Sequence, residues 1–147
     1  LGNEAGFSET GGNMLYISNS NTSTPLIKGD FSANQVWING TVTANSFLYS
    51  SDLRLKKHIK PINNALQDLE AINGVTFQWK NKSTAKGVEL GLIAQEVEKV
   101  FPEVVFEGKD GYKSIDYARL IPVLIQAMKE QQKEISSLKE ELRKIKK

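Results

Sequence analysis

A heptad repeat near the C-terminus is the feature that most restricts the fold of this chain. Residues spaced alternately by three and four positions, all apolar except Gln131, occupy the a and d sites of the repeat and form what we call the seam: Ile121, Leu124, Met128, Gln131, Ile135, Leu138, Leu142 and Ile145. Glu134 and Glu141 fall at g, while Lys139 and Lys146 fall at e, where pairs form between neighbouring helices of a coiled coil. The pattern predicts one long helix that packs against other helices.

The partners of this helix are expected to be other copies of the chain. A helix that packs only on its own domain is the alternative, but residues 133–147 extend beyond any residues left to cover them. Ile at two a positions with Leu or Ile at d is compatible with a trimer. Gln131 would form a polar layer that fixes the register. Asp116 is the expected N-cap, and Pro122 is expected to remove one backbone bond and bend the helix.

The first 50 residues have a different composition and are expected to form short strands. They contain one lysine and three acidic residues, whereas the remaining 97 residues have a net charge of +4. Short β-branched or aromatic runs alternate with Asn, Ser, Thr and Gly, as short strands and turns require, at 15–17, 25–27, 36–38 and 41–43. Asn39-Gly40 predicts a two-residue hairpin between the last two runs.

This N-terminal part is too poor in apolar residues to remain folded alone. Only 39% of the whole chain is hydrophobic, and ordering each residue costs about 1 to 2 kcal/mol of backbone entropy. We therefore expect it to fold by association with other copies of itself.

The middle of the chain predicts a small α+β unit. Helical spacing covers residues 62–72, with Asn73-Gly74 as the expected C-cap, and again residues 90–100. Strands are expected at 75–79, 104–106 and 112–115, with a polar loop over 80–87.

Composition excludes several classes of site. The absence of cysteine rules out disulfides, thiol nucleophiles and cysteine zinc sites, and a single histidine argues against the usual metal sites, so no metal and no cofactor are expected. No apolar run approaches the roughly 20 residues of a membrane span. The net charge of +2 gives no reason to expect a nucleic-acid partner.

The junction between the two compositions is a candidate catalytic site. Ser51 is followed five residues later by Lys56, which could accept the serine proton if the segment curls. A free lysine has a pKa near 10.4, so such a base needs surroundings that favour its neutral form. A capped turn with a solvated basic face is the alternative. His58 is the other possible base, but in this lysine-rich stretch a solvated role is favoured.

Several motifs in the right order identify a family resemblance. They are Ser51-Asp52-x-Arg54-x-Lys56, Gly91-Leu92-Ile93-Ala94-Gln95-Glu96-Val97 with Pro102-Glu103, and Asp116-Tyr117-Ala118-Arg119-Leu120-Ile121-Pro122. Together they resemble the self-cleaving intramolecular chaperone domain at the C-terminus of phage tailspikes, tail fibres and neck appendages, first described in endosialidases. The resemblance covers residues 51 to about 147, and residues 1–50 resemble more loosely the end of a fibre stalk.

The resemblance implies a chaperone that releases itself. Three stalk strands would intertwine in register, and the chain would then be cut between Ser50 and Ser51. The family's nucleophile matches Ser51 and its general base matches Lys56, while Asp52 and Arg54 match the residues that hold this arrangement.

The expected fold class is mixed. A β-rich trimeric stalk end over 1–50 precedes a chaperone domain over 51–147, made of an α+β part at 51–115 and a coiled-coil helix at 116–147. The expected partners are two further copies and the preceding stalk, with neither nucleic acid nor membrane. The fibre would belong to the virion and assemble in the host cytoplasm. The alternative function is a permanent cap that trimerises a fibre without cleavage.

Overall fold

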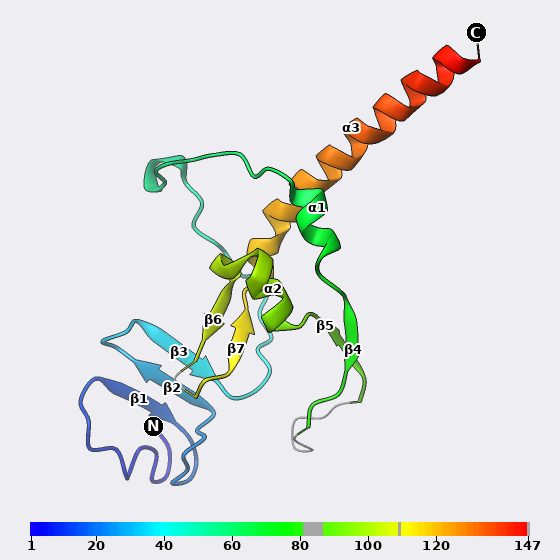
Figure 1. The fold of residues 1–147 in the computed structure, drawn as a ribbon. Coiled ribbons are helices and arrows are strands. Elements are labelled where there is room, and N and C mark those ends of the chain that lie inside the picture. Colours follow the sequence, from blue (N-terminus) through cyan, green and yellow to red (C-terminus); the bar gives the residue numbers. More distant parts are fainter. Residues whose placement is uncertain (81–86, 109, 147) are drawn as a thin grey trace. The chain divides into compact units, whose positions relative to one another are not determined.

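The structure is a computed structural model that describes residues 1–80, 87–108 and 110–146. The chain divides into two compact units, Leu1–Lys56 and Lys57–Lys147, which are described separately (Figure 1). The expected loop over 80–87 therefore lies mostly outside the described residues. No described helix is long and apolar enough to cross a membrane.

The first unit contains a three-stranded antiparallel sheet. Its strands are β1 (Met14–Ile17), β2 (Ile27–Asp30) and β3 (Gln35–Ile38), in the order β1-β2-β3. Tyr16 lies opposite Lys28, which lies opposite Trp37. Asp30 Oδ1 accepts hydrogen bonds from the backbone N–H groups of residues 32 and 33 and so organises the turn that leads into β3. Three of the four expected apolar runs thus contribute residues to strands.

The predicted hairpin at Asn39-Gly40 is wrong, because residues 41–50 form no strand. The Asn39 backbone N–H donates to the Leu26 carbonyl at 2.9 Å, and its side-chain amide donates to the Thr24 carbonyl at 3.3 Å. Asn39 therefore extends the pairing between β3 and the chain before β2 instead of turning the chain back. The second expected run is also shifted, since Pro25 and Leu26 precede β2.

The second unit is a mixture of helices and small sheets, as the sequence predicts. Its elements are α1 (Ala65–Glu70), β4 (Val75–Phe77), β5 (Glu89–Gly91), α2 (Ala94–Val100), the 3-10 helix η2 (Pro102–Val104), β6 (Val105–Glu107), β7 (Lys113–Ile115), the 3-10 helix η3 (Tyr117–Leu120) and α3 (Ile121–Ile145). β4 pairs with β5 and β6 with β7, each antiparallel. The long C-terminal helix is confirmed.

Four local expectations in this unit need correction. α1 ends at Glu70 with Ala71 as its C-cap, so Asn73-Gly74 does not cap it. Leu90 belongs to β5, where it pairs with Thr76, and not to the second helix. The other two corrections concern the start of α3.

Asp116 caps η3 and not α3 itself. Its carboxylate accepts a hydrogen bond from the Arg119 backbone N–H at 3.3 Å. η3 leads directly into α3, and Pro122 then lies in the first turn of α3. Because the first N–H groups of a helix have no intrahelical partner, proline costs no backbone bond there, and the expected bend has no cause.

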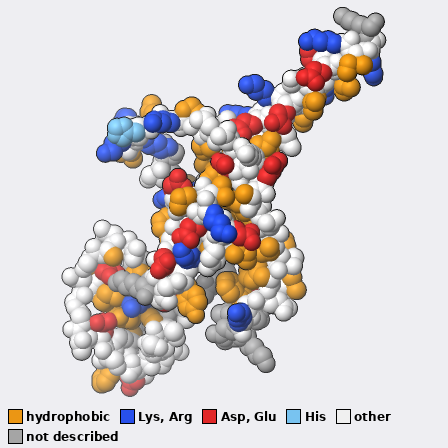
Figure 2. Space-filling view, viewed as in Figure 1, with side chains coloured by type: hydrophobic (Ala, Val, Ile, Leu, Met, Phe, Trp, Pro, Cys, Tyr) orange, Lys and Arg blue, Asp and Glu red, His pale blue; other side chains and the backbone are white. Residues whose placement is uncertain are grey.

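The two halves of α3 differ in solvent exposure. Val123 and Ala127 are buried against the rest of the unit, while every described residue from 131 onward is exposed. Figure 2 shows hydrophobic side chains following one side of this exposed half. The exposed hydrophobic members of the seam are Ile121, Leu124, Met128, Ile135, Leu138, Leu142 and Ile145.

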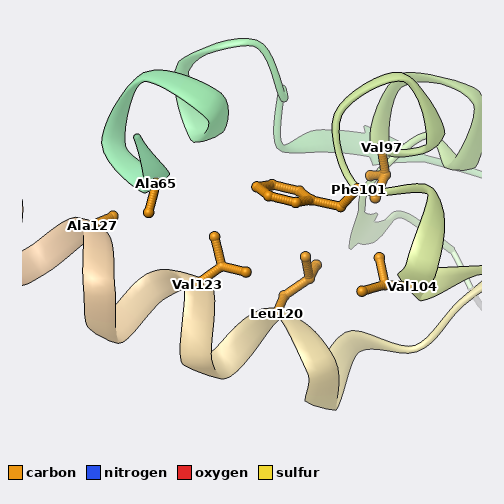
Figure 3. Close-up of a cluster of buried hydrophobic side chains, with 7 residues drawn as sticks. All are labelled: Ala65, Val97, Phe101, Val104, Leu120, Val123 and Ala127. Carbon is orange, nitrogen blue, oxygen red and sulfur yellow. The ribbon is translucent and has the colours of Figure 1, made fainter. Parts of the chain in front are cut away.

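The core of the second unit lies where α3 meets α1 and α2. Its buried side chains are Ala65, Val97, Phe101, Val104, Leu120, Val123 and Ala127 (Figure 3). Ala65 of α1 faces Ala127, and Phe101 lies between α1 and the chain that carries Leu120 (Figure 3). The buried residues of α3 thus all lie in its first two turns.

Candidate functional site

The backbone around residue 51 forms a single capped turn. A short 3-10 helix, η1 (Leu53–Leu55), has Asp52 as its N-cap, and the Asp52 carboxylate accepts from the Arg54 backbone N–H at 2.8 Å. The Lys56 N–H closes the turn on the Leu53 carbonyl at 3.1 Å. A turn of this size reverses the chain enough to bring side chains five residues apart to the same side.

Ser51 and Lys56 meet across this turn. The Lys56 ammonium group donates a hydrogen bond to the Ser51 hydroxyl, with 2.7 Å between Nζ and Oγ. This distance is typical of the hydrogen bond between a nucleophile and its base. For catalysis the proton must travel the other way, from the Ser51 hydroxyl to an uncharged amine.

Asp52 and Arg54 form a second pair within the same turn. Arg54 Nη2 lies 2.8 Å from Asp52 Oδ2, and Arg54 Nε lies 3.0 Å from Asp52 Oδ1, which makes a two-pronged ion pair. The Arg54 side chain, followed by the Arg54 backbone N–H, lowers the pKa of Asp52, and the same contact raises the pKa of Arg54. Because the pair also satisfies the N-cap, it braces the turn that carries Ser51 and Lys56.

The whole site is open to solvent in the single chain. Ser50, Ser51 and Lys56 are all exposed, and the Arg54 side chain is 88% exposed. Water stabilises a charged ammonium, so the single chain lacks the burial that would favour a neutral lysine.

His58 follows the turn with a left-handed backbone angle, φ 54°, and an exposed side chain. Figure 2 shows it among Lys and Arg side chains. The Ser51 hydroxyl contacts Lys56, so Lys56 is the better placed of the two candidate bases.

Sequence reasoning did not find a cavity in the second unit. It has a volume of about 590 Å³ and is lined mainly by side chains from β4, β5, β7 and the start of α2. Phe77 and Trp79 meet edge to face there, with ring centres 5.2 Å apart. The Tyr117 hydroxyl accepts a hydrogen bond from the Leu92 backbone N–H at 3.0 Å.

Gly91 explains part of the second family motif. A Cβ atom at this position would lie 2.9 Å from the Phe77 ring and 3.1 Å from the Tyr117 hydroxyl. A larger residue at position 91 would therefore require the Phe77 and Tyr117 side chains to shift. The glycine at the start of the motif indicates a close approach of another group. Its two aromatic neighbours could not be predicted, because they are distant in sequence.

Metal binding has no support in the described residues, which contain no group of three or more His, Cys, Asp or Glu side chains able to hold an ion. The functional groups present at the turn are a hydroxyl, an amine and an ion pair.

Comparisons with known proteins agree with the motif order. Residues 51–106 match the family described as the chaperone of endosialidase. These residues belong to that family. The match begins at Ser51, the residue where the composition changes, and it confirms the recognition of a C-terminal chaperone domain of phage fibre proteins.

Curated relatives include long tail fibre proteins of several phages. The long tail fibre protein Gp37 of Salmonella phage S16 is 33% identical over 75% of this chain, and that of Enterobacteria phage K3 is 32% identical over 69%. The corresponding protein of Escherichia phage AR1 is 39% identical over 42% of the chain. The chain spans 16%, 9% and 6% of these relatives, respectively. Together with the family match, these relatives support a chaperone or trimerisation role in a fibre.

Proposed function

We propose that this chain is the end of a phage fibre stalk followed by its intramolecular chaperone, which cuts itself off between Ser50 and Ser51. The observation that carries the proposal is the 2.7 Å contact between Lys56 Nζ and Ser51 Oγ. The boundary between stalk and chaperone then lies before Ser51, six residues before the division between the two compact units.

The reaction proceeds in two steps. Neutral Lys56 takes the Ser51 hydroxyl proton while Oγ attacks the Ser50 carbonyl carbon. The bond from that carbon to the Ser51 nitrogen breaks, and the nitrogen leaves as an amine after receiving a proton. Water then hydrolyses the Ser50 ester and restores the Ser51 hydroxyl. Because nucleophile and carbonyl belong to adjacent residues, proximity supplies much of the rate.

Assembly controls when this reaction occurs. Three copies join through the seam, and packing of the copies covers the turn that is solvent-exposed in the single chain. Loss of water favours the neutral amine of Lys56. The fibre is a virion component, and its chaperone part leaves after the cut.

Substitutions at the turn test the proposal. Ser51→Ala and Lys56→Gln abolish cleavage, because the first removes the nucleophile and the second removes the base. Lys60→Gln is the matched control and leaves cleavage intact. Denaturing electrophoresis after expression separates the two outcomes, and cleavage that persists in Ser51→Ala rules out the proposed nucleophile.

A permanent fibre cap is the second candidate function. The exposure of the whole turn favours it, since an exposed turn does not promote the attack. A stable trimer that remains one intact band in both the wild type and Ser51→Ala identifies the cap.

A further inference from the structure

α1 is fixed on one particular flank of α3. Ala65 packs against Val123 and Ala127, which occupy the c and g positions of the heptad (Figure 3). Glu130, at the next c position, accepts a hydrogen bond from the Leu66 backbone N–H at 2.9 Å. α1 therefore covers the side of α3 that borders the seam at its g positions.

Glu130 of α3 caps the N-terminus of α1, which its own N-cap residue leaves uncapped. Asn64 precedes α1 in a left-handed conformation, and its side chain makes no capping bond. The Glu130 carboxylate replaces it from the other helix, and Gln126 Nε2 holds the second carboxylate oxygen at 3.2 Å. This cap ties the position of α1 to the register of α3.

In a parallel coiled coil, the side of each helix that carries the g positions faces a particular side of the next helix. The g positions of one helix lie beside the e positions of the next. At the level of α1 the e position is Ile125, which is apolar, lies outside the seam and is 50% exposed in the single chain. A coiled coil built from a and d residues alone would leave this side chain at the edge of the interface.

Charges on the facing surfaces are opposite. α1 carries Asp68 and Glu70 and no basic residue. On the adjacent face of α3, Lys129 occupies the b position next to Ile125 at the level of α1. Oppositely charged side chains at the edge of an interface favour the association of the two surfaces and fix their register.

We propose that α1 of each copy packs on the neighbouring copy, over Ile125 and beside Lys129. The interface between copies then has two layers, the seam and an outer α1 layer. This inference rests on the proposed parallel trimer. It assigns α1 a role in recognising a second copy, in addition to its place in the core of its own unit.

Cross-linking between differently labelled copies tests the contact. The chain contains no cysteine, so each introduced thiol is unique. Copies carrying Gln67→Cys are mixed with copies carrying Lys129→Cys, refolded together and treated with a short thiol cross-linker. Any product must join two chains. Glu140→Cys, at an outward f position, replaces Lys129→Cys in the matched control.

A second variant measures the energy of the contact. Ile125 is half-exposed in the single chain, so burying the remainder makes Ile125→Ser weaken assembly several-fold, whereas Lys133→Ser at an f position changes it little. Sedimentation measures both. Cross-links at Lys129→Cys but not at Glu140→Cys, with weaker assembly of Ile125→Ser, support the proposal. A trimer with neither effect overturns the α1 layer alone, and a chain that stays monomeric overturns the proposed trimer as well.

Discussion

The two halves of α3 have the same heptad pattern but opposite surroundings. In the first half Val123 and Ala127 are buried, and Glu130 caps α1. In the second half every described residue is exposed, including Ile135 and Leu138. The first half is held by its own chain at positions beside the seam, and the seam itself remains uncovered throughout. A single helix can therefore anchor one domain and still expose a seam that is apolar except at Gln131.

The difference separates folding from assembly. Substitutions in the buried half should act on the stability of one chain, while substitutions in the exposed half should act on association between chains.

The largest effect is expected in the exposed half. Ile135→Asp combined with Leu138→Asp places charges in the seam and abolishes trimers, because burying unpaired carboxylates is costly. Self-cleavage is lost with the trimer, while the unfolding of the second unit is unchanged. Lys133→Asp combined with Ser136→Asp is the matched control outside the seam and leaves sedimentation unchanged. A monomeric seam variant that still cleaves at the normal rate contradicts the link between assembly and cleavage.

A core substitution in η3, immediately before α3, should give the opposite result. Leu120 is 6% exposed, so Leu120→Ala destabilises a single chain by about 2–5 kcal/mol in urea unfolding. Leu142→Ala in the exposed half changes the unfolding of the monomer by less than about 0.5 kcal/mol. Equal losses from both variants in a monomeric sample would remove the distinction between the halves.

The smallest effect concerns the cap between α3 and α1. The Leu66 N–H lowers the pKa of Glu130 below its ordinary value of 4.5, with a smaller contribution from Gln126. A lowered pKa in the folded state stabilises the fold above the unfolded value, and this stability is lost as pH falls through the folded pKa.

Glu130→Gln tests this contribution. The variant should be less stable than the wild type at pH 7, and the difference should shrink below about pH 4.5 as the wild-type carboxylate is protonated. Urea midpoints at several pH values measure it, with Glu134→Gln as the control. A difference that stays constant with pH shows that the charge of Glu130 does not matter.

Local patterns could be predicted well from the sequence. The heptad spacing is repeated over many turns, so it identified α3 with little ambiguity. Ser51 and Lys56 are five residues apart, and Asp52 with Arg54 two apart, so a single turn determines both contacts. The catalytic roles of these residues stay predictions.

Features that depend on distant residues could not be predicted. Glu130 caps a helix 64 residues earlier in the chain, and Tyr117 reaches a backbone group 25 residues away. The failed hairpin has a similar cause, because Asn39 makes its bonds to Leu26 and Thr24, which precede it by more than ten residues. Turn propensity describes the nearest residues only and does not include such competing partners.

Intact-mass analysis of the purified trimer tests the central claim most directly. The account predicts two products, residues 1–50 and 51–147, with a free amine on Ser51, and a single uncut mass for Lys56→Gln under the same conditions. A trimer that retains only the full-length mass after prolonged incubation, or a cut at any other bond, contradicts self-cleavage by Ser51 and Lys56.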